Sequence, residues 1–322
     1  MKAIIQTGYG SPDGFELREI AKPGIKKDDD VLVRIHAAAL HAGDVFIMRG
    51  VPYMTRMVVG VPKPSNYVPG YDGAGIVEAV GKNVSAFKPG DEVYGSISHS
   101  CAEYVITQEK NLERKPANLL MQQAGAVATS AIAALHGIRD AGKVQPGQKV
   151  LINGASGGVG TYAVQIAKAY GADVTGVCSG RNAEMVRSIG ADHVIDYTQE
   201  NFTKGGPRYD LILDNVANHP LSACRKALTP GGAHIPNSGQ SGLGYIIKAA
   251  IVSRFVRQQG GAYFATTKPG DLKELKELIE AGKVTPVIDR IVPFDEFCKA
   301  MRHLNEGHAQ GKVVISVAPE GS

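Results

Sequence analysis

A glycine-rich stretch over residues 155–160 carries the residue types best suited to chemistry in this 322-residue chain. Glycine at 157 lets the backbone approach a pyrophosphate, and glycine at 160 lets a helix pack closely on a strand. The N–H groups and dipole at the start of a helix attract phosphate. A tight turn that binds nothing is the alternative, and Ala155 departs from the G-x-G-x-x-G pattern. Because a strand and a helix flank the turn, we expect a dinucleotide phosphate site at Ser156, Gly157, Gly158, Val159 and Gly160.

The loop about twenty residues further on indicates which nucleotide binds. An Asp or Glu at the end of the second strand usually holds the 2′-hydroxyl of the adenine ribose. This chain has Ser179-Gly180-Arg181 there instead. A hydroxyl and a guanidinium suit a phosphate, so Ser179 and Arg181 favour NADPH over NADH. Tyr197 follows the third strand and is a weaker candidate at the same edge, since a lone tyrosine is more often a packing residue.

Two different patterns of elements surround the glycine turn. The first ~115 residues read as short strands separated by turns, with a short helix over 42–49 and an irregular loop over 51–66. From residue 121 helices alternate with strands, which is typical of a doubly wound parallel sheet. In this part we expect strands over 150–153, 173–178, 193–197, 211–214 and 233–235, and helices over 121–141, 161–170, 182–189 and 220–227. The tail has predicted helices over 271–281 and 294–306 and strands over 287–292 and 312–317.

Composition bounds the class of protein. The net charge of +4 is too small to indicate a nucleic-acid partner. The four cysteines, Cys101, Cys178, Cys224 and Cys298, have no metal-ligand spacing, which suits a reducing compartment. The N-terminus lacks the apolar core of a signal peptide, and no run has the length of a membrane helix. We therefore expect a cytoplasmic enzyme.

Several segments together resemble the medium-chain dehydrogenase/reductase superfamily, in its zinc-independent quinone-oxidoreductase-like branch. The resemblance covers nearly the whole chain, and its main segments are 68–75, 90–95, 153–160, 188–197 and 307–317. It implies a GroES-like, mostly β catalytic domain over 1–120 that is completed by 267–322, and a Rossmann domain over 121–266. It also implies a homodimer. We further expect Thr129, Asn215, Ser238 and Lys312 to contact the cofactor.

The resemblance makes the question of zinc specific. Zinc-dependent relatives place a Cys near 41, a His near 71 and a Cys near 129, where this chain has His41, Tyr71 and Thr129. His41 and Asp72 alone make two plausible ligands, and a catalytic zinc site needs three. We expect no metal.

Without a metal, the reaction must suit simple hydride delivery to a quinone or an α,β-unsaturated carbonyl, because a few hydrogen-bond donors then stabilise the charge on the carbonyl oxygen. Tyr53 resembles the cleft tyrosine of these reductases and is our candidate donor, although packing in a lid is nearly as good an interpretation. His41 can donate or supply the proton. Asp44 completes the catalytic candidates, but a carboxylate that orders the start of a helix is the stronger interpretation.

Two features leave other hypotheses open. The family commonly has Thr near 133, where this chain has Ala133, and a nucleotide-binding scaffold or stress protein without turnover is therefore an alternative. A zinc alcohol dehydrogenase that uses His41 and Asp72 is another. A predicted helix over 243–258 has apolar and basic residues; packing against the protein or a partner subunit is favoured over peripheral contact with a membrane.

Overall fold

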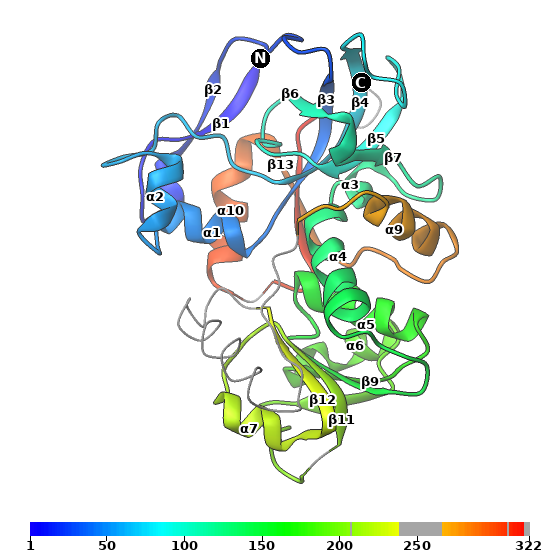
Figure 1. Ribbon diagram of the computed structural model, residues 1–322. Helices are drawn as coiled ribbons and strands as arrows, with labels where there is room; N and C mark the ends of the chain where they lie inside the picture. Colours follow the sequence, from blue (N-terminus) through cyan, green and yellow to red (C-terminus); the bar gives the residue numbers. More distant parts are fainter. Residues whose placement is uncertain (207, 238–265, 308, 319–322) are drawn as a thin grey trace. The chain divides into compact units, whose positions relative to one another are not determined.

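The computed structural model describes residues 1–206, 208–237, 266–307 and 309–318 (Figure 1). The chain divides into two compact units. Unit 1 comprises Met1–Thr129, Thr267–Glu280 and Pro286–Ser322, and unit 2 comprises Ser130–Thr266 and Ala281–Thr285. The tail therefore returns to the N-terminal unit.

Unit 1 is built on a seven-stranded sheet in the order β13-β14-β3-β4-β5-β7, with β6 also paired to β3. The members of this sheet are β3 (Asp30–Leu40), β4 (Asp72–Val80), β5 (Glu92–Ser96), β6 (Tyr104–Gln108), β7 (Leu112–Arg114), β13 (Ile288–Pro293) and β14 (Lys312–Ser316). Strands β1 (Lys2–Gln6) and β2 (Phe15–Glu19) form a separate antiparallel pair. The antiparallel pairing of β14 with β3 joins the tail to the N-terminal strands.

Strand β3 is the centre of unit 1. Its alternating sequence predicts a strand with one exposed face, and this expectation is wrong because ten of its eleven residues are buried. The reason is its position: β3 pairs with β4, β6 and β14, and its residues contribute to the core of the unit. The small side chains of Ala37 and Ala39 indicate the burial of this strand better than its alternating pattern does.

Five α-helices lie wholly within the described part of unit 1: α1 (Ala42–Arg49), α2 (Met54–Val59), α3 (Met121–Ala124), α9 (Asp271–Glu280) and α10 (Phe297–Asn305). Helix α1 has the predicted bounds and ends at Gly50, whose φ of 63° is the left-handed conformation that glycine adopts at little cost. Helix α2 lies inside the segment that was expected to be irregular. The run between Pro52 and Gly60 is just long enough for one and a half turns of helix.

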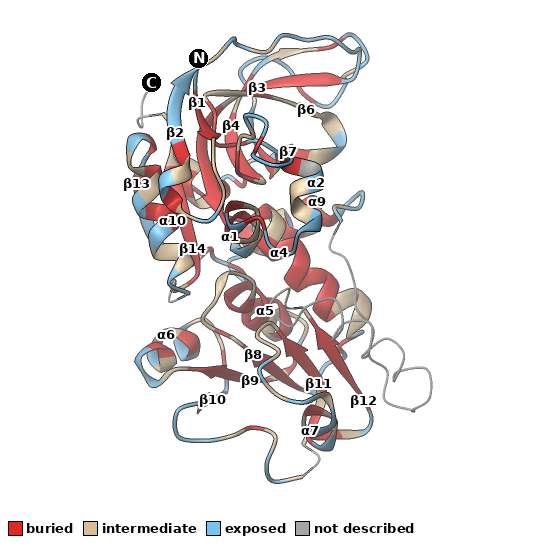
Figure 2. Cartoon of the chain, turned by 90° about the vertical axis from the view of Figure 1, so that its left-hand side faces the viewer, coloured by how far each residue is buried: buried red, intermediate tan, exposed pale blue. Residues whose placement is uncertain are grey.

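The described residues of unit 2 form a five-stranded parallel sheet in the order β10-β9-β8-β11-β12. The strands are β8 (Lys149–Asn153), β9 (Asp173–Cys178), β10 (His193–Asp196), β11 (Tyr209–Asp214) and β12 (Leu228–Pro236). Figure 2 shows β8, β9 and β11 mostly buried, whereas the edge strand β10 has only one buried residue, Ile195. The order reverses between β8 and β11, and ligands of doubly wound folds bind at the carboxyl ends of the strands beside such a reversal.

In the described part of unit 2, the α-helices that follow strands of the sheet keep the predicted alternation. They are α5 (Gly158–Ala169), α6 (Ala183–Ser188) and α7 (Leu221–Lys226). The predicted helix over 121–141 is divided into α3, α4 (Ala128–Leu135) and a π-helical segment, His136–Ala141, and the unit boundary falls within α4 after Thr129. The predicted helix over 243–258 lies outside the described residues. No helix in the described ranges is long and apolar enough to cross a bilayer.

Candidate active site

The glycine turn of unit 2 has the geometry that a pyrophosphate site needs. Helix α5 begins at Gly158, three residues earlier than predicted, and no side-chain hydrogen bond caps its N-terminus. A Cβ at Gly160 would lie 2.0 Å from the Gly154 carbonyl oxygen, so packing of the turn on the helix requires glycine at 160.

Gly157 is different. A Cβ at this position would meet the nearest described atom, the Gly154 carbonyl oxygen, at 3.4 Å, and its φ of −84° suits any residue. Nothing within the described chain therefore requires glycine at 157. A ligand that approaches the backbone closely would require it, and the turn fits the phosphates of a nucleotide.

The loop after β9 joins this turn. Asn182 donates from Nδ2 to the Ser156 hydroxyl over 3.0 Å, and the Asn182 side chain is buried. The hydrogen bond fixes Ser156 against the segment that contains Ser179 and Arg181. Arg181 itself is exposed, and Tyr197, which is 58% exposed, lies at the neighbouring strand end, where its N–H donates to the Cys178 carbonyl over 3.1 Å.

A carboxylate that spacing along the chain missed lies beside this loop. Asp196 ends β10, which is paired with the end of β9, and a Cβ at Gly180 would come within 2.5 Å of its Oδ2. Oδ1 accepts hydrogen bonds from the Thr198 N–H (3.0 Å) and hydroxyl (2.8 Å). These bonds, with one from the Gly180 N–H, hold the pKa of Asp196 below its usual value. Only the pairing of β10 with β9 reveals this neighbour.

At the reversal point, polar side chains link the ends of three strands. Asn153, at the end of β8, donates to Asp214 Oδ1 over 2.8 Å, and Asn215 donates to the Asn153 carbonyl over 3.1 Å. Asn237 donates to Asn215 Oδ1 over 2.8 Å. Asn215 therefore lies directly after β11 at the carboxyl edge of the sheet, and its contact with the cofactor stays a prediction. Ser238 lies outside the described residues.

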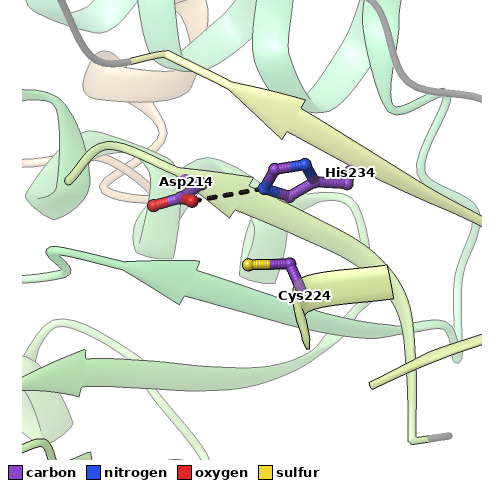
Figure 3. A group of neighbouring side chains, drawn as sticks. All are labelled: Asp214, Cys224 and His234. Carbon is purple, nitrogen blue, oxygen red and sulfur yellow. Dashed lines mark hydrogen bonds and ion pairs between the residues drawn. The ribbon is translucent and has the colours of Figure 1, made fainter. Parts of the chain in front are cut away.

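Asp214 also belongs to a buried cluster with Cys224 on α7 and His234 on β12, shown in Figure 3. The three ligand atoms lie within 4.8 Å of one another, and His234 Nε2 is 3.2 Å from Asp214 Oδ2. Asp214 Oδ1 also accepts from the N–H of Ala217 over 2.7 Å. Burial acts to raise the pKa of Asp214, but the hydrogen bonds from His234 and Ala217 outweigh it and keep the carboxyl ionised.

This cluster is better described as a structural network than as a metal centre. Burial raises the pKa of the Cys224 thiol to about 12, so Cys224 takes part in this network as a neutral thiol. The carboxylate that would bind the ion already holds the ends of β8, β11 and β12 together through its hydrogen bonds.

In unit 1, His41 and Asp44 form the start of α1. The His41 Nδ1 accepts from the Gly43 N–H over 3.0 Å, and Asp44 Oδ2 accepts from the His41 N–H over 2.9 Å. Asp44 Oδ1 accepts from the Gly70 N–H over 3.1 Å. Because Asp44 is 1% exposed and both of its oxygens hold backbone, it orders two loops, as the helix-start interpretation expects.

The Gly70 loop carries two tyrosines that sequence reasoning did not select. Tyr67 donates its hydroxyl to the Tyr71 oxygen over 3.0 Å, and the Tyr71 ring lies 5.0 Å from the His41 ring, centroid to centroid. Burial is the main cause that raises the pKa of each phenol. The available signal for Tyr71 was its position, since zinc-dependent relatives have a zinc-ligand His near 71. From the sequence, this position served only as an argument against a metal.

Tyr53 lies at the start of α2 and is 74% exposed. Its ring stacks on the Arg56 guanidinium, 4.4 Å from the carbon to the ring centroid, and Arg56 also lies over Tyr9. The Tyr9 hydroxyl donates to the Gly60 carbonyl over 2.7 Å. The ring of Tyr53 is thus held by Arg56 on the surface of unit 1.

Lys312 and Thr129 meet at one carboxylate. Lys312 Nζ lies 3.2 Å from Asp72 Oδ2, and the Thr129 N–H donates to Asp72 Oδ1 over 2.7 Å. The Asp72 and Lys312 side chains are 0% and 1% exposed. The assignment of Lys312 and Thr129 as cofactor contacts stays a prediction; the interactions that fix them here are with Asp72.

The same geometry bears on zinc. Asp72, one of the two plausible ligands, is committed to a lysine and a backbone N–H, and His41 is not part of a ligand cluster among the residues that the structure describes. The described residues of unit 1 therefore do not fit a zinc site that uses His41 and Asp72.

Comparison with known proteins agrees with this architecture. Residues 27–138 match the alcohol dehydrogenase GroES-like domain, and residues 189–315 match the zinc-binding dehydrogenase family. The chain is 36% identical to 2-methylene-furan-3-one reductase of Solanum lycopersicum and 34% identical to the NADPH-dependent alkenal/one oxidoreductase of Arabidopsis thaliana chloroplasts. Each alignment covers 99% of this chain and 80% of the relative.

Among solved structures, the quinone oxidoreductase from Coxiella burnetii superimposes with a TM-score of 0.88 at 27% identity, covering 99% of both chains. The chain therefore belongs to the medium-chain dehydrogenase/reductase superfamily, as a quinone-oxidoreductase-like NAD(P)H oxidoreductase.

Proposed function

We propose that the protein is an NADPH-dependent, metal-independent reductase of quinones or α,β-unsaturated carbonyls. The observation that carries the proposal is the glycine turn, where position 157 is glycine without any packing reason within the described chain. The relatives named for alkenal, furanone and quinone substrates support the acceptor class. Ser156, Gly157, Gly158 and the start of α5 would hold the phosphates, and Ser179 and Arg181 the adenosine.

When bound, the reduced nicotinamide supplies a hydride. Its addition to the β-carbon of an enone leaves the electron pair on the carbonyl oxygen, and one proton from water or a side chain completes the saturated ketone. The chain's task is to orient the acceptor and donate hydrogen bonds to that oxygen. His41 and Tyr53 are the predicted donors, and Asp44 is a positioning residue for His41.

An acceptor screen tests the proposal. Purified protein with a panel of quinones and enals is expected to oxidise NADPH faster than NADH, as followed by nicotinamide absorbance. Tight NADPH binding without transfer to any acceptor would favour the scaffold hypothesis instead.

The Arg181→Ala variant should lose much of the preference for NADPH. A guanidinium–phosphate hydrogen bond contributes about 1.5–3 kcal/mol, so we expect KM for NADPH to rise roughly tenfold or more while KM for NADH changes little. Arg187→Ala is the matched control, since Arg187 is an exposed arginine on α6. If Asp196→Asn instead raised KM for NADH and Arg181→Ala changed neither value, a carboxylate would hold the ribose and the assignment would be wrong.

Tyr53→Phe is expected to lower turnover about tenfold while NADPH affinity stays unchanged, because loss of one neutral donor removes a hydrogen bond to the developing charge. The variant keeps the ring that stacks on Arg56. Tyr9→Phe is the control, since its hydroxyl is engaged by Gly60. Equal turnover in wild type and Tyr53→Phe would remove Tyr53 from the mechanism.

We propose that activity needs no zinc, supported by the engagement of Asp72 with Lys312 and Thr129. Stoichiometric zinc in active protein, with activity lost on chelation and restored by zinc, would overturn this. We also propose a homodimer, on the family resemblance, and a cytoplasmic location, on the four free cysteines. Size-exclusion chromatography with light scattering and fractionation of cells test these two proposals.

A further inference from the structure

We propose that the Tyr71 hydroxyl and the His41 Nε2–H together form a two-donor site for the substrate oxygen on which negative charge collects, with Tyr67 as the positioning residue. The inference rests on the proposed function, because that reaction produces an enolate or a quinol anion. It adds Tyr71 to the predicted donors and assigns an atom to His41.

The first donor is fixed by its hydrogen bond to the backbone. Because the Gly43 N–H donates to His41 Nδ1, the neutral imidazole carries its hydrogen on Nε2. A Cβ at Gly43 would lie 2.6 Å from His41 Cε1, so glycine leaves the room in which the ring lies. Within the described ranges, Nε2 is buried and has no hydrogen-bond partner. A buried N–H without an acceptor is costly, and a ligand oxygen would supply one.

The second donor is oriented by its neighbour. Tyr67 uses its hydrogen to donate to the Tyr71 oxygen, so the Tyr71 hydrogen is directed to another acceptor. Burial, the larger cause, raises the pKa of both phenols, and both therefore stay protonated at neutral pH. The bond from Tyr67 acts in the opposite direction on Tyr71 and makes its hydroxyl a stronger donor. Tyr67 is itself held edge-on by the His99 ring, with centroids 5.3 Å apart.

The rings that carry the two donors lie close together on ordered backbone. The rings of His41 and Tyr71 have centroids 5.0 Å apart and are tilted by 40°. Asp44 binds the N–H of His41 with one oxygen and the N–H of Gly70, next to Tyr71, with the other. One buried carboxylate thus fixes both loops, which is the preorganisation that a site for developing negative charge requires.

The site would favour an oxygen with two available lone pairs, such as that of an enolate or phenolate. A hydroxyl group would bind less well, because its own hydrogen needs an acceptor and the site consists of two donors. The probe is therefore 4-nitrophenol, titrated against the complete protein by absorbance over a range of pH. We expect the phenolate form to bind, and its bound pKa to fall below that of the free dye. Reduction of an enal with NADPH is measured in parallel.

Four variants separate the roles. Tyr71→Phe is expected to weaken nitrophenolate binding about tenfold and to lower kcat/KM for the enal about 100-fold. Serine at 41 can cap α1 but is too short to reach the ligand, so His41→Ser should act similarly without loss of the helix. Tyr67→Phe should weaken nitrophenolate binding and lower kcat/KM only about threefold, because Tyr71 keeps its own hydroxyl hydrogen. Tyr104→Phe, on β6, is the control and should change neither value.

The outcomes distinguish the two proposals. Wild-type protein that reduces enals but binds no nitrophenolate, or whose Tyr71→Phe and His41→Ser variants behave like wild type, would overturn the two-donor site and leave the reductase intact. Protein that reduces no acceptor, yet binds nitrophenolate with the expected order of variants, would support the site while the proposed function fails. Thermal unfolding of each variant shows whether a loss of binding or of activity comes from a loss of folding. The double variant Tyr67→Phe/Tyr71→Phe removes the Tyr67 hydroxyl, which Tyr71→Phe alone leaves without its partner.

Discussion

The Gly160→Ala variant is expected to lose NADPH binding together with much of the stability of unit 2. A methyl group at 160 would lie 2.0 Å from the Gly154 carbonyl oxygen and 2.8 Å from the Ala155 Cα. Both neighbours are backbone, so no change of side-chain rotamer relieves the overlap. Overpacking of a tight core costs about 1–3 kcal/mol and more where the backbone must move, so we expect a loss of about 3 kcal/mol or more. Denaturant unfolding followed by circular dichroism measures it.

The matched variant is Gly157→Ala, three residues earlier in the same turn. Its Cβ meets the Gly154 carbonyl oxygen at 3.4 Å, an ordinary contact, and φ is −84°. Unfolding should therefore stay close to that of wild type, while NADPH affinity falls because the new methyl group occupies the path of the pyrophosphate. If Gly157→Ala binds NADPH normally, the turn does not hold the phosphates in the proposed way. If Gly160→Ala is as stable as wild type, the close packing of the turn is not a constraint.

Periodicity and turn chemistry predict the parallel sheet of unit 2. The glycine turn, the strand over 173–178 and the alternation of strands with helices are all local patterns, and the parallel sheet follows from them. The start of α5 was predicted three residues late, since glycine has a low helix propensity and Gly158 and Gly160 disfavour a helix in isolation. Contacts made by the turn override this propensity.

The polar networks depend on pairings between distant segments and could not be predicted from spacing. Asp196 reaches the loop after β9 because β10 and β9 are neighbours in the sheet. The Tyr67–Tyr71 hydrogen bond is local in sequence, but its relation to His41 depends on how Asp44 binds Gly70. The burial of β3 on both faces likewise follows from the elements that surround it and not from its own alternation.

The ion pair between Lys312 and Asp72 predicts the second large effect. Lys312→Met leaves the Asp72 carboxylate buried without its ammonium partner, and breaking a buried ion pair from one side costs about 3–5 kcal/mol. The free energy of unfolding, measured with denaturant, should fall accordingly. Lys299→Met is the control, because the Lys299–Glu296 pair lies on the surface of α10 and should contribute little. Asp72→Asn/Lys312→Met should recover part of the loss, since no unpaired charge then remains and an amide oxygen can still accept from the Thr129 N–H.

The same series separates the two interpretations of Lys312. If its ammonium serves only the fold, the double variant should bind NADPH as wild type does once enough of it is folded, because Asp72 and Thr129 retain their hydrogen bond. A cofactor contact would instead lower NADPH affinity in the double variant as much as in Lys312→Met. A Lys312→Met variant with wild-type stability would show that the Asp72 carboxylate is compensated by groups other than Lys312. The burial of Lys312 and Asp72 favours the structural role, since Lys312 is 1% exposed and its ammonium is already paired with the Asp72 carboxylate.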